Sequence, residues 1–224
     1  MSEAPSTRGG RGSSDTRARL PLTRERVLVA ALRLIDEHGL DQLSMRKLGA
    51  ELGVEAMSLY NHVNSKAALL QGVAELALHE LELPGPDVTD WRERLRIGLR
   101  SLRRVAKAHP GAYTLLATAR LTSPAAVVPV EVAFDALYKA GFDDETAVYA
   151  FHTLIGYVLG YVLQELGGPF GTRTGAFAAA YDRMPATGYP RIRVFLPTGA
   201  DPDPDREFEF GLDTVLNGLA ARLP

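Results

Sequence analysis

The side chains that usually catalyse reactions or bind metals are few and scattered in this chain. Its five histidines lie at positions 38, 62, 79, 109 and 152, and none of their spacings matches the HxxxH or HExxH pattern of a metal site. There is no cysteine, which excludes thiolate chemistry and disulfides. The aspartates at 143–144 and within 201–205 are interpreted as a helix cap and a loop. We therefore predict no catalytic residue, no metal site and no cofactor, and an enzyme acting on small molecules is the remote alternative.

A different chemistry is concentrated between Ser44 and Lys66. Its short, polar or aromatic side chains are Ala56, Met57, Ser58, Tyr60, Asn61 and His62. Hydroxyl, amide and imidazole groups bind phosphates and base edges, so this surface fits a DNA groove better than bulk solvent. Lys66 opens the next expected helix, where its charge and the free N–H groups both favour a phosphate.

Two short helices are expected to hold these side chains in place. Apolar residues recur four apart on both sides of Gly53, at positions 48 and 52 before it and at 59 and 63 after it. Gly53 can turn the chain at positive φ, and Gly49 is small where the two helices would cross. The pattern predicts a helix-turn-helix. An ordinary helical hairpin with a solvated polar face is the alternative reading.

The surrounding sequence favours the first reading. Residues 22–78 resemble the DNA-binding domain of the TetR family of bacterial repressors through four runs: Ala31–Leu40, Ser44–Val54, Leu59–Val63 and Lys66–Leu70. The resemblance implies that Ser44, Arg46 and Lys66 contact phosphates, with the Arg46 position also able to reach a guanine edge. It further implies that Tyr60 and His62 contact the DNA backbone.

Base edges would then be read by the remaining side chains of the second helix, which are Ala56, Met57, Ser58 and Asn61. Positions 56, 57 and 61 differ from the glutamine, proline and tryptophan of the tetracycline repressor. The operator is therefore expected to differ in sequence while keeping two-fold symmetry.

The rest of the chain is also expected to be helical, which makes the predicted fold class all-α. Apolar residues at helical spacing predict helices over about 23–38, 65–83, 90–107, 110–120, 124–140, 144–166 and 204–222, with a short one near 175–183. We divide the chain into a disordered basic tail (1–19), the DNA-binding domain (20–66) and a ligand-binding and dimerisation domain (67–224). The tail lacks the apolar segment of a signal peptide, so a cytoplasmic protein is expected.

The helix expected over 144–166 is apolar on all sides. Thr146–Gln164 carries no acidic side chain, lysine or arginine, so a membrane span and a buried interface helix are both considered. His152, Thr153 and two glycines argue against the membrane. Gly156 and Gly160, four apart, would let a second helix approach closely, which predicts a dimer interface.

The C-terminal half resembles the tetracycline-repressor subgroup in Trp91, His109-Pro110, Ala140–Asp143 and Phe210–Leu219. The resemblance implies that the last two long helices form a four-helix bundle with those of a second copy. The apolar stripe of the last helix, Leu212, Val215, Leu216 and Leu219, is assigned to that interface.

The same resemblance implies a ligand-binding body, and a small hydrophobic effector is the expected ligand. Candidate lining residues are Leu99, Leu102, Tyr113, Leu116, Thr118, Phe134, Phe151, His152 and Ile155. For each one, simple core packing is the alternative. The many arginines between positions 92 and 107 are expected to form ion pairs within the chain rather than to bind DNA. A regulator of the same fold that senses a protein partner, or no ligand, is the alternative function.

Overall fold

The computed structural model describes residues 21–118, 120, 123–167 and 203–223, and within these ranges all regular structure is helical. The elements are α1 (Arg24–His38), η1 (Leu40–Gln42), α2 (Met45–Leu52), α3 (Ala56–Leu59), α4 (Lys66–Leu78), α5 (Trp91–Ala108), η2 (Pro110–Ala112), α6 (Tyr113–Thr118), α7 (Pro124–Ala140), α8 (Asp144–Glu165) and α10 (Pro204–Ala220). The all-α prediction is confirmed. The predicted tail at 1–19 and the short helix near 175–183 lie outside the described residues.

The helices begin and end at residues whose chemistry suits a helix end. The Ser44 Oγ accepts a hydrogen bond from the Lys47 N–H (3.2 Å), and the Ser65 Oγ accepts one from the Ala68 N–H (3.0 Å). At the start of α8 the Asp143 carboxylate accepts from the Thr146 N–H at 2.8 Å. Gly53 follows α2 with φ +68°, the left-handed conformation that glycine adopts without a steric penalty. These local signals fix the helix boundaries.

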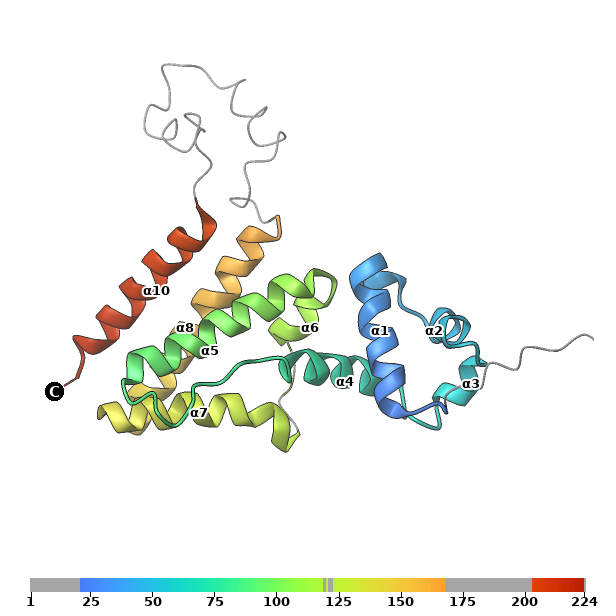
Figure 1. The fold of residues 1–224 in the computed structure, drawn as a ribbon, viewed down its shortest axis with the longest axis horizontal. Helices are drawn as coiled ribbons and strands as arrows, with labels where there is room; N and C mark the ends of the chain where they lie inside the picture. Colours follow the sequence, from blue (N-terminus) through green and yellow to red (C-terminus); the bar gives the residue numbers. More distant parts are fainter. Residues whose placement is uncertain (1–20, 119, 121–122, 168–202, 224) are drawn as a thin grey trace, which may run out of the picture.

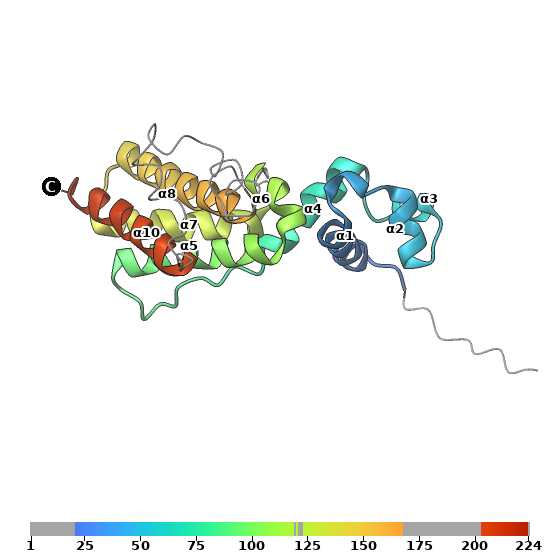
Figure 2. The same cartoon turned by 90° about the horizontal axis from the view of Figure 1, so that it is seen from above.

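The molecule is elongated, with α1, α2 and α3 at one end and α5, α7, α8 and α10 forming a body at the other (Figures 1 and 2). α4 joins the two parts, because it packs against α1 on one side and against α5, α6 and α7 on the other. One cluster of buried apolar side chains runs from α1 to α10. The division predicted at residues 66 and 67 falls at the first residue of this connecting helix.

A second contact joins the two parts where η2 meets the end of α1. A Cβ at Gly111 would overlap the carbonyl oxygen of Ile35, so the backbones approach as closely as a glycine allows. Beside it, the His109 Nδ1 lies 2.7 Å from the Asp36 carboxylate and its Nε2 lies 3.2 Å from the Glu80 carboxylate. Burial disfavours the charged ring, but these hydrogen bonds raise the pKa of His109 above its ordinary value.

The fourth helix is shorter than the sequence predicted. α4 ends at Leu78 rather than near Leu83, and an irregular connector over residues 79–90 follows. α5 side chains bind the connector's backbone: the Glu82 N–H donates to the buried Ser101 Oγ (2.7 Å), and Arg104 donates to the Glu80 carbonyl (3.0 Å). Because these groups have partners without a helix, the chain leaves α4 as an irregular connector, in which Leu81 is half-buried and Leu83 is exposed.

α8 is long and apolar enough to cross a membrane by length and composition. In the structure one stripe of it, Ala147, Ala150, Leu154, Val158 and Val162, is buried against the rest of the body. The Tyr157 hydroxyl donates to the Phe208 carbonyl at 2.7 Å, and Gly211 leaves room for the Tyr157 ring. These contacts join α8 to α10 and are those of a core helix.

Candidate DNA-binding surface and body cavity

α2 and α3 form the helix-turn-helix that the sequence predicted. Leu48 and Leu59 are fully buried and Val63 nearly so, which ties both helices to α1. A Cβ at Gly49 would lie 2.8 Å from the Val54 carbonyl oxygen, so only a glycine permits this crossing. α3 itself has four residues, but hydrogen bonds continue its helical turn to Val63.

The predicted DNA contacts gather on the outer side of this unit. Met57 is 72% exposed and Tyr60 40%, and Arg46, Asn61 and Lys66 are also exposed. The half-buried members of the set are Ser44, Ala56, Ser58 and His62. A methionine so exposed gains nothing from the fold, whereas in a major groove it can contact a thymine methyl group. The exposure of Met57, Tyr60 and Asn61 leaves these side chains open to a partner molecule.

The charges of this surface are free. Arg46 and Lys66 form no ion pair or side-chain hydrogen bond with any residue that the structure describes. Neighbouring charges are paired instead: Lys47 donates to the Gln42 side chain at 2.8 Å, and Arg33 binds Glu51. Two unpaired cations beside the α3 surface are what phosphate binding requires.

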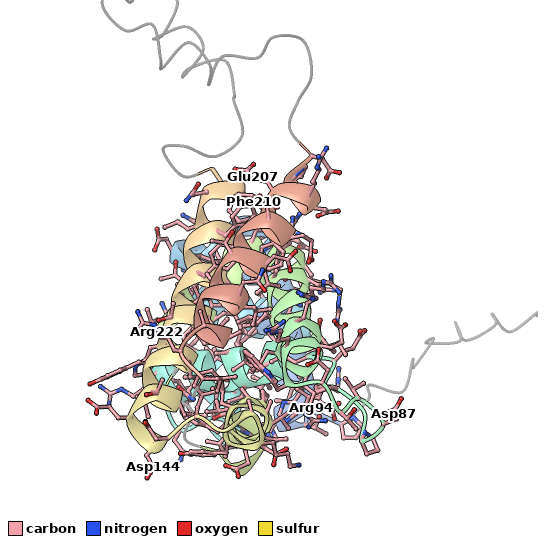
Figure 3. All side chains as sticks on the ribbon, turned by 90° about the vertical axis from the view of Figure 1, so that its left-hand side faces the viewer. Asp87, Arg94, Asp144, Glu207, Phe210 and Arg222 are labelled. Carbon is pink, nitrogen blue, oxygen red and sulfur yellow. The ribbon has the colours of Figure 1, made fainter. Side chains whose placement is uncertain are left out.

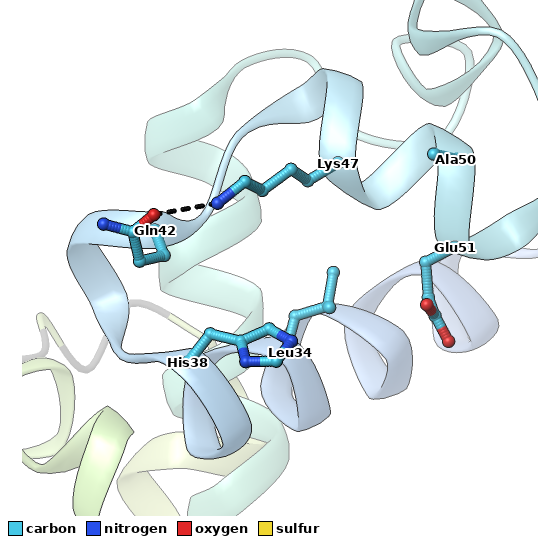
Figure 4. Close-up of a pocket in the computed structure, with 6 residues that line it drawn as sticks. All are labelled: Leu34, His38, Gln42, Lys47, Ala50 and Glu51. Carbon is cyan, nitrogen blue, oxygen red and sulfur yellow. Dashed lines mark hydrogen bonds between the residues drawn. The ribbon is translucent and has the colours of Figure 1, made fainter.

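A hollow of about 690 Å³ opens between α1, η1 and α2 (Figure 4). Leu34 and Ala50 line it together with the polar side chains of His38, Gln42, Lys47 and Glu51. Because it is wide open to solvent and four of its six lining side chains are polar, it would bury little of an organic ligand.

The body contains a smaller and more apolar cavity of about 220 Å³. Its walls come from α5, α6, α7 and α8 and from the end of α4 with its connector. The lining residues are Leu78, Leu81, Leu83, Pro84, Arg94, Leu95, Gly98, Leu99, Leu102, Leu116, Ala117, Ala126, Pro129, Val130, Val132, Ala133, Phe151, Leu154, Ile155 and Leu159. Five residues expected from the sequence are among them: Leu99, Leu102, Leu116, Phe151 and Ile155.

Four other expected residues lie outside this lining, and their assignment is corrected. The Tyr113 hydroxyl donates to the Leu159 carbonyl, and the Thr118 hydroxyl donates to the Thr114 carbonyl within its own helix. Phe134 stacks behind Phe151 with ring centroids 5.1 Å apart, and His152 is exposed. Sequence reasoning missed the connector wall and Arg94, because it read the connector as helix and Arg94 as part of a basic face.

α8 and α10 lie side by side (Figure 3), and α8 carries the predicted interface glycines. Gly156 and Gly160 are exposed, with no atom near the position of a Cβ. Leu212, Leu216 and Leu219 are buried in their own protomer and Val215 is half-buried, so the leucines belong to the core rather than to an interface. Large exposed apolar side chains of these two helices include Tyr149, Leu163 and Phe210, the last 75% exposed.

Five of the six arginines of α5 form ion pairs within the chain, as the sequence predicted; among the described residues Arg92 has no such pair and lies over the Trp91 ring. Arg103, only 11% exposed, binds Glu165 through two hydrogen bonds of 2.8 and 2.7 Å and lies 4.6 Å over the Phe208 ring. Burial opposes ionisation of Glu165, but the hydrogen bonds from Arg103 and Lys107 hold its pKa below its ordinary value. Arg96 pairs with Asp213 and Arg100 with Glu209. Within the described residues no cluster of His, Asp and Glu could hold a metal ion.

A helix-turn-helix with free cations, connected by one helix to an all-helical body with an apolar cavity, defines a DNA-binding regulator class. Residues 27–73 match the family of bacterial regulatory proteins, tetR family. Residues 83–223 match the family described as tetracyclin repressor-like, C-terminal domain. The chain therefore belongs to the TetR family of DNA-binding transcriptional regulators.

Named relatives agree along nearly the whole chain. An HTH-type transcriptional regulator of Saccharopolyspora erythraea is 31% identical over 97% of this chain and 93% of its own length. The class A tetracycline repressor protein of Escherichia coli, from transposon 1721, is 33% identical over 88% of this chain and 89% of its own. ActR of Streptomyces coelicolor, solved in complex with actinorhodin, is 36% identical with a TM-score of 0.75, covering 90% of this chain and 98% of that one.

Proposed function

We propose that the chain is a homodimeric repressor that binds a near-palindromic operator and is released by a small hydrophobic effector. The exposed, unpaired cations beside the α3 surface support operator binding. One helix-turn-helix covers only a half-site, so we expect two copies with half-sites about one helical turn, or a small multiple, apart. The exposed glycines and aromatic side chains of α8 and α10 supply a face for the second copy. Repression in the bacterial cytoplasm is the expected setting.

The cavity supports control by a small molecule, and it is the observation that carries the proposal. Leu78, the last residue of α4, and Leu81 of the connector are part of its wall. A molecule filling the cavity therefore contacts the helix that is continuous with the DNA-binding unit. If the ligand favours a dimer in which α4 is shifted, the two α3 surfaces no longer match successive major grooves.

The alternative is a regulator of the same fold that senses a protein or nothing at all. A filled core would favour that alternative, whereas a cavity of about 220 Å³ favours the effector. For comparison, ActR was solved with actinorhodin, and the class A relative is named a tetracycline repressor.

Selection of DNA fragments by the purified protein would provide the operator, and its symmetry and the stoichiometry of the complex test the dimer. Tight binding of one monomer to an asymmetric site would contradict the proposal. The effector is tested by reciprocity. If a ligand weakens operator binding by some factor, the operator must weaken binding of that ligand by the same factor. A compound that binds equally well with and without operator is not an inducer.

A further inference from the structure

Arg94 is the one charged side chain among the described residues that line the body cavity. It lies in the first turn of α5, and its Nη1 donates to the carbonyl oxygens of Gly85 (3.2 Å) and Val88 (3.0 Å) in the connector. Its side chain is 14% exposed, and its Nε is buried without a hydrogen-bond acceptor. Native structures rarely leave a buried N–H without a partner. The Arg92 Nε is left in the same way, but Arg92 lies outside the cavity lining, so Arg94 alone presents such a group in the cavity wall among the described residues.

The charge of Arg94 is only partly neutralised. The nearest carboxylate is that of Asp135 on α7, 3.7 Å from the Arg94 Nη2. Lys139, one turn further along α7, binds the same carboxylate oxygen at the shorter distance of 2.8 Å. Two cations therefore share one anion, and this end of an otherwise apolar cavity is left with excess positive charge.

An apolar wall with one under-neutralised guanidinium defines what the cavity can bind. The body of the ligand must be hydrocarbon, because side chains such as Leu99, Leu116 and Phe151 offer it no polar partner. Its head must accept hydrogen bonds, and the pairing of guanidinium with carboxylate is the strong form of that contact. The volume of about 220 Å³ lies below the range usual for drug-sized ligands, which favours a molecule of one or two rings.

We propose that the cavity binds a small hydrophobic monocarboxylate, with its carboxylate accepting a hydrogen bond from the Arg94 Nε. This assignment rests on the proposed function, since it names the class of effector for the same cavity. Arg94 also holds the connector that follows α4, so a carboxylate bound to it contacts the link to the DNA-binding unit.

The test uses the full-length dimer and three probes with the same rings: 2-naphthoate, its methyl ester and 2-naphthylmethylamine. Isothermal titration at neutral pH, where the acid is ionised, should show 2-naphthoate binding at least about tenfold more tightly than the ester and no binding of the amine. Equal affinities for acid and ester, or no binding of the acid at millimolar concentration, would overturn the proposal.

Two variants separate the charge from the shape of the cavity. Arg94→Gln should weaken 2-naphthoate about tenfold and leave the ester unchanged, whereas Arg92→Gln, on the same turn but outside the lining, should change neither. Asp135→Asn removes the competing anion while keeping Arg94, so it should strengthen the acid severalfold and leave the ester unchanged. If circular dichroism shows that Arg94→Gln does not fold, the Asp135→Asn variant alone tests the proposal. An unchanged ratio of acid affinity to ester affinity in that variant would reject it.

Failure of this proposal can be distinguished from failure of the proposed function. If all three probes bind alike and release the operator, the cavity remains an effector site and only the role of Arg94 is lost. If the protein binds no operator, the proposed function fails whatever the probes do.

Discussion

The cations of the DNA-binding unit and those of α5 have opposite surroundings. Arg46 and Lys66 are exposed and have no partner within the described chain. On α5, Arg96 and Arg100 each bind a carboxylate of α10, and Arg103 binds a carboxylate of α8. The density of positive charge in the sequence is higher on α5, yet most of that charge is paired there, whereas Arg46 and Lys66 have no partner within the described residues.

The difference shows that a count of cations does not tell which of them are free to bind a phosphate. A cation paired with a carboxylate contributes to the fold, and removing it from the pair leaves the carboxylate without a partner. A cation with no partner can bind a phosphate without breaking anything. Four predictions test this contrast and the junction between the two parts, and we take them from the largest expected effect to the smallest.

The largest effect is expected at Arg103. Arg103→Met leaves the largely buried Glu165 with Lys107 as its remaining cation, so the free energy of unfolding should fall by about 3 kcal/mol. Urea denaturation at neutral pH and fixed protein concentration measures the loss. The double variant Arg103→Met with Glu165→Leu should recover most of it, because both charges are then gone. A loss below about 1 kcal/mol would place Arg103 with ordinary surface pairs.

The next effect concerns binding rather than stability. Lys66→Ala and Arg46→Ala should each weaken operator binding about tenfold and reduce the slope of log affinity against log salt by about 0.9. The free energy of unfolding should stay within about 0.5 kcal/mol of the parent, since neither side chain has a partner to lose. Asn61→Ala serves as the matched control and should alter which operator variants are preferred. A Lys66 variant with an unchanged salt slope would contradict the phosphate assignment.

A smaller effect is expected at Arg100, which pairs with Glu209 through two hydrogen bonds at the surface. Because the Arg100 side chain is about half exposed, Arg100→Gln should lower the free energy of unfolding by only roughly 0.2–1 kcal/mol. At high salt this difference should fall below the error of the measurement. Operator affinity should not change. Weaker DNA binding by this variant would mean that α5 charges do reach DNA.

The smallest effect is a pH dependence at the junction of the two parts. The hydrogen bonds of His109 to Asp36 and Glu80 raise its pKa in the folded state, so its stabilising contribution is full below the unfolded pKa of about 6.5. That contribution is lost as the pH rises through the folded pKa. The stability difference between the parent and His109→Gln should therefore shrink on going from acidic to alkaline pH. A difference that grows with pH would reject the charged pairing.

The DNA-binding unit was readable from sequence because its signals are local. Capping serines, a turn glycine and leucines four apart each act within a few residues, and Leu48, Gly53 and Leu59 lie where they were expected. The body was harder to predict because helical periodicity shows that a face is apolar without showing what covers it. Leu212 and Leu216 were read as facing a second copy, but α8 and the rest of the same protomer bury them.

The cavity depended on long-range contacts that no spacing reveals. Leu81 and Leu83 continue the helical pattern of α4, yet Ser101 and Arg104, more than fifteen residues away, bind the connector backbone and hold both leucines at the cavity wall. Arg94 was grouped with its basic neighbours for the same reason. Its position in the cavity wall follows from how α5 meets the connector and α7, which the sequence does not state.

The four-residue α3 has a consequence for how such a regulator can change over evolutionary time. Leu59 and Val63 anchor the segment in the core, while Met57 and Asn61 on the same turns are exposed. Substitutions at the exposed positions should therefore cost little stability, as is usual for surface sites. A lineage carrying this fold can acquire a new operator one side chain at a time, without first accumulating stabilising mutations elsewhere.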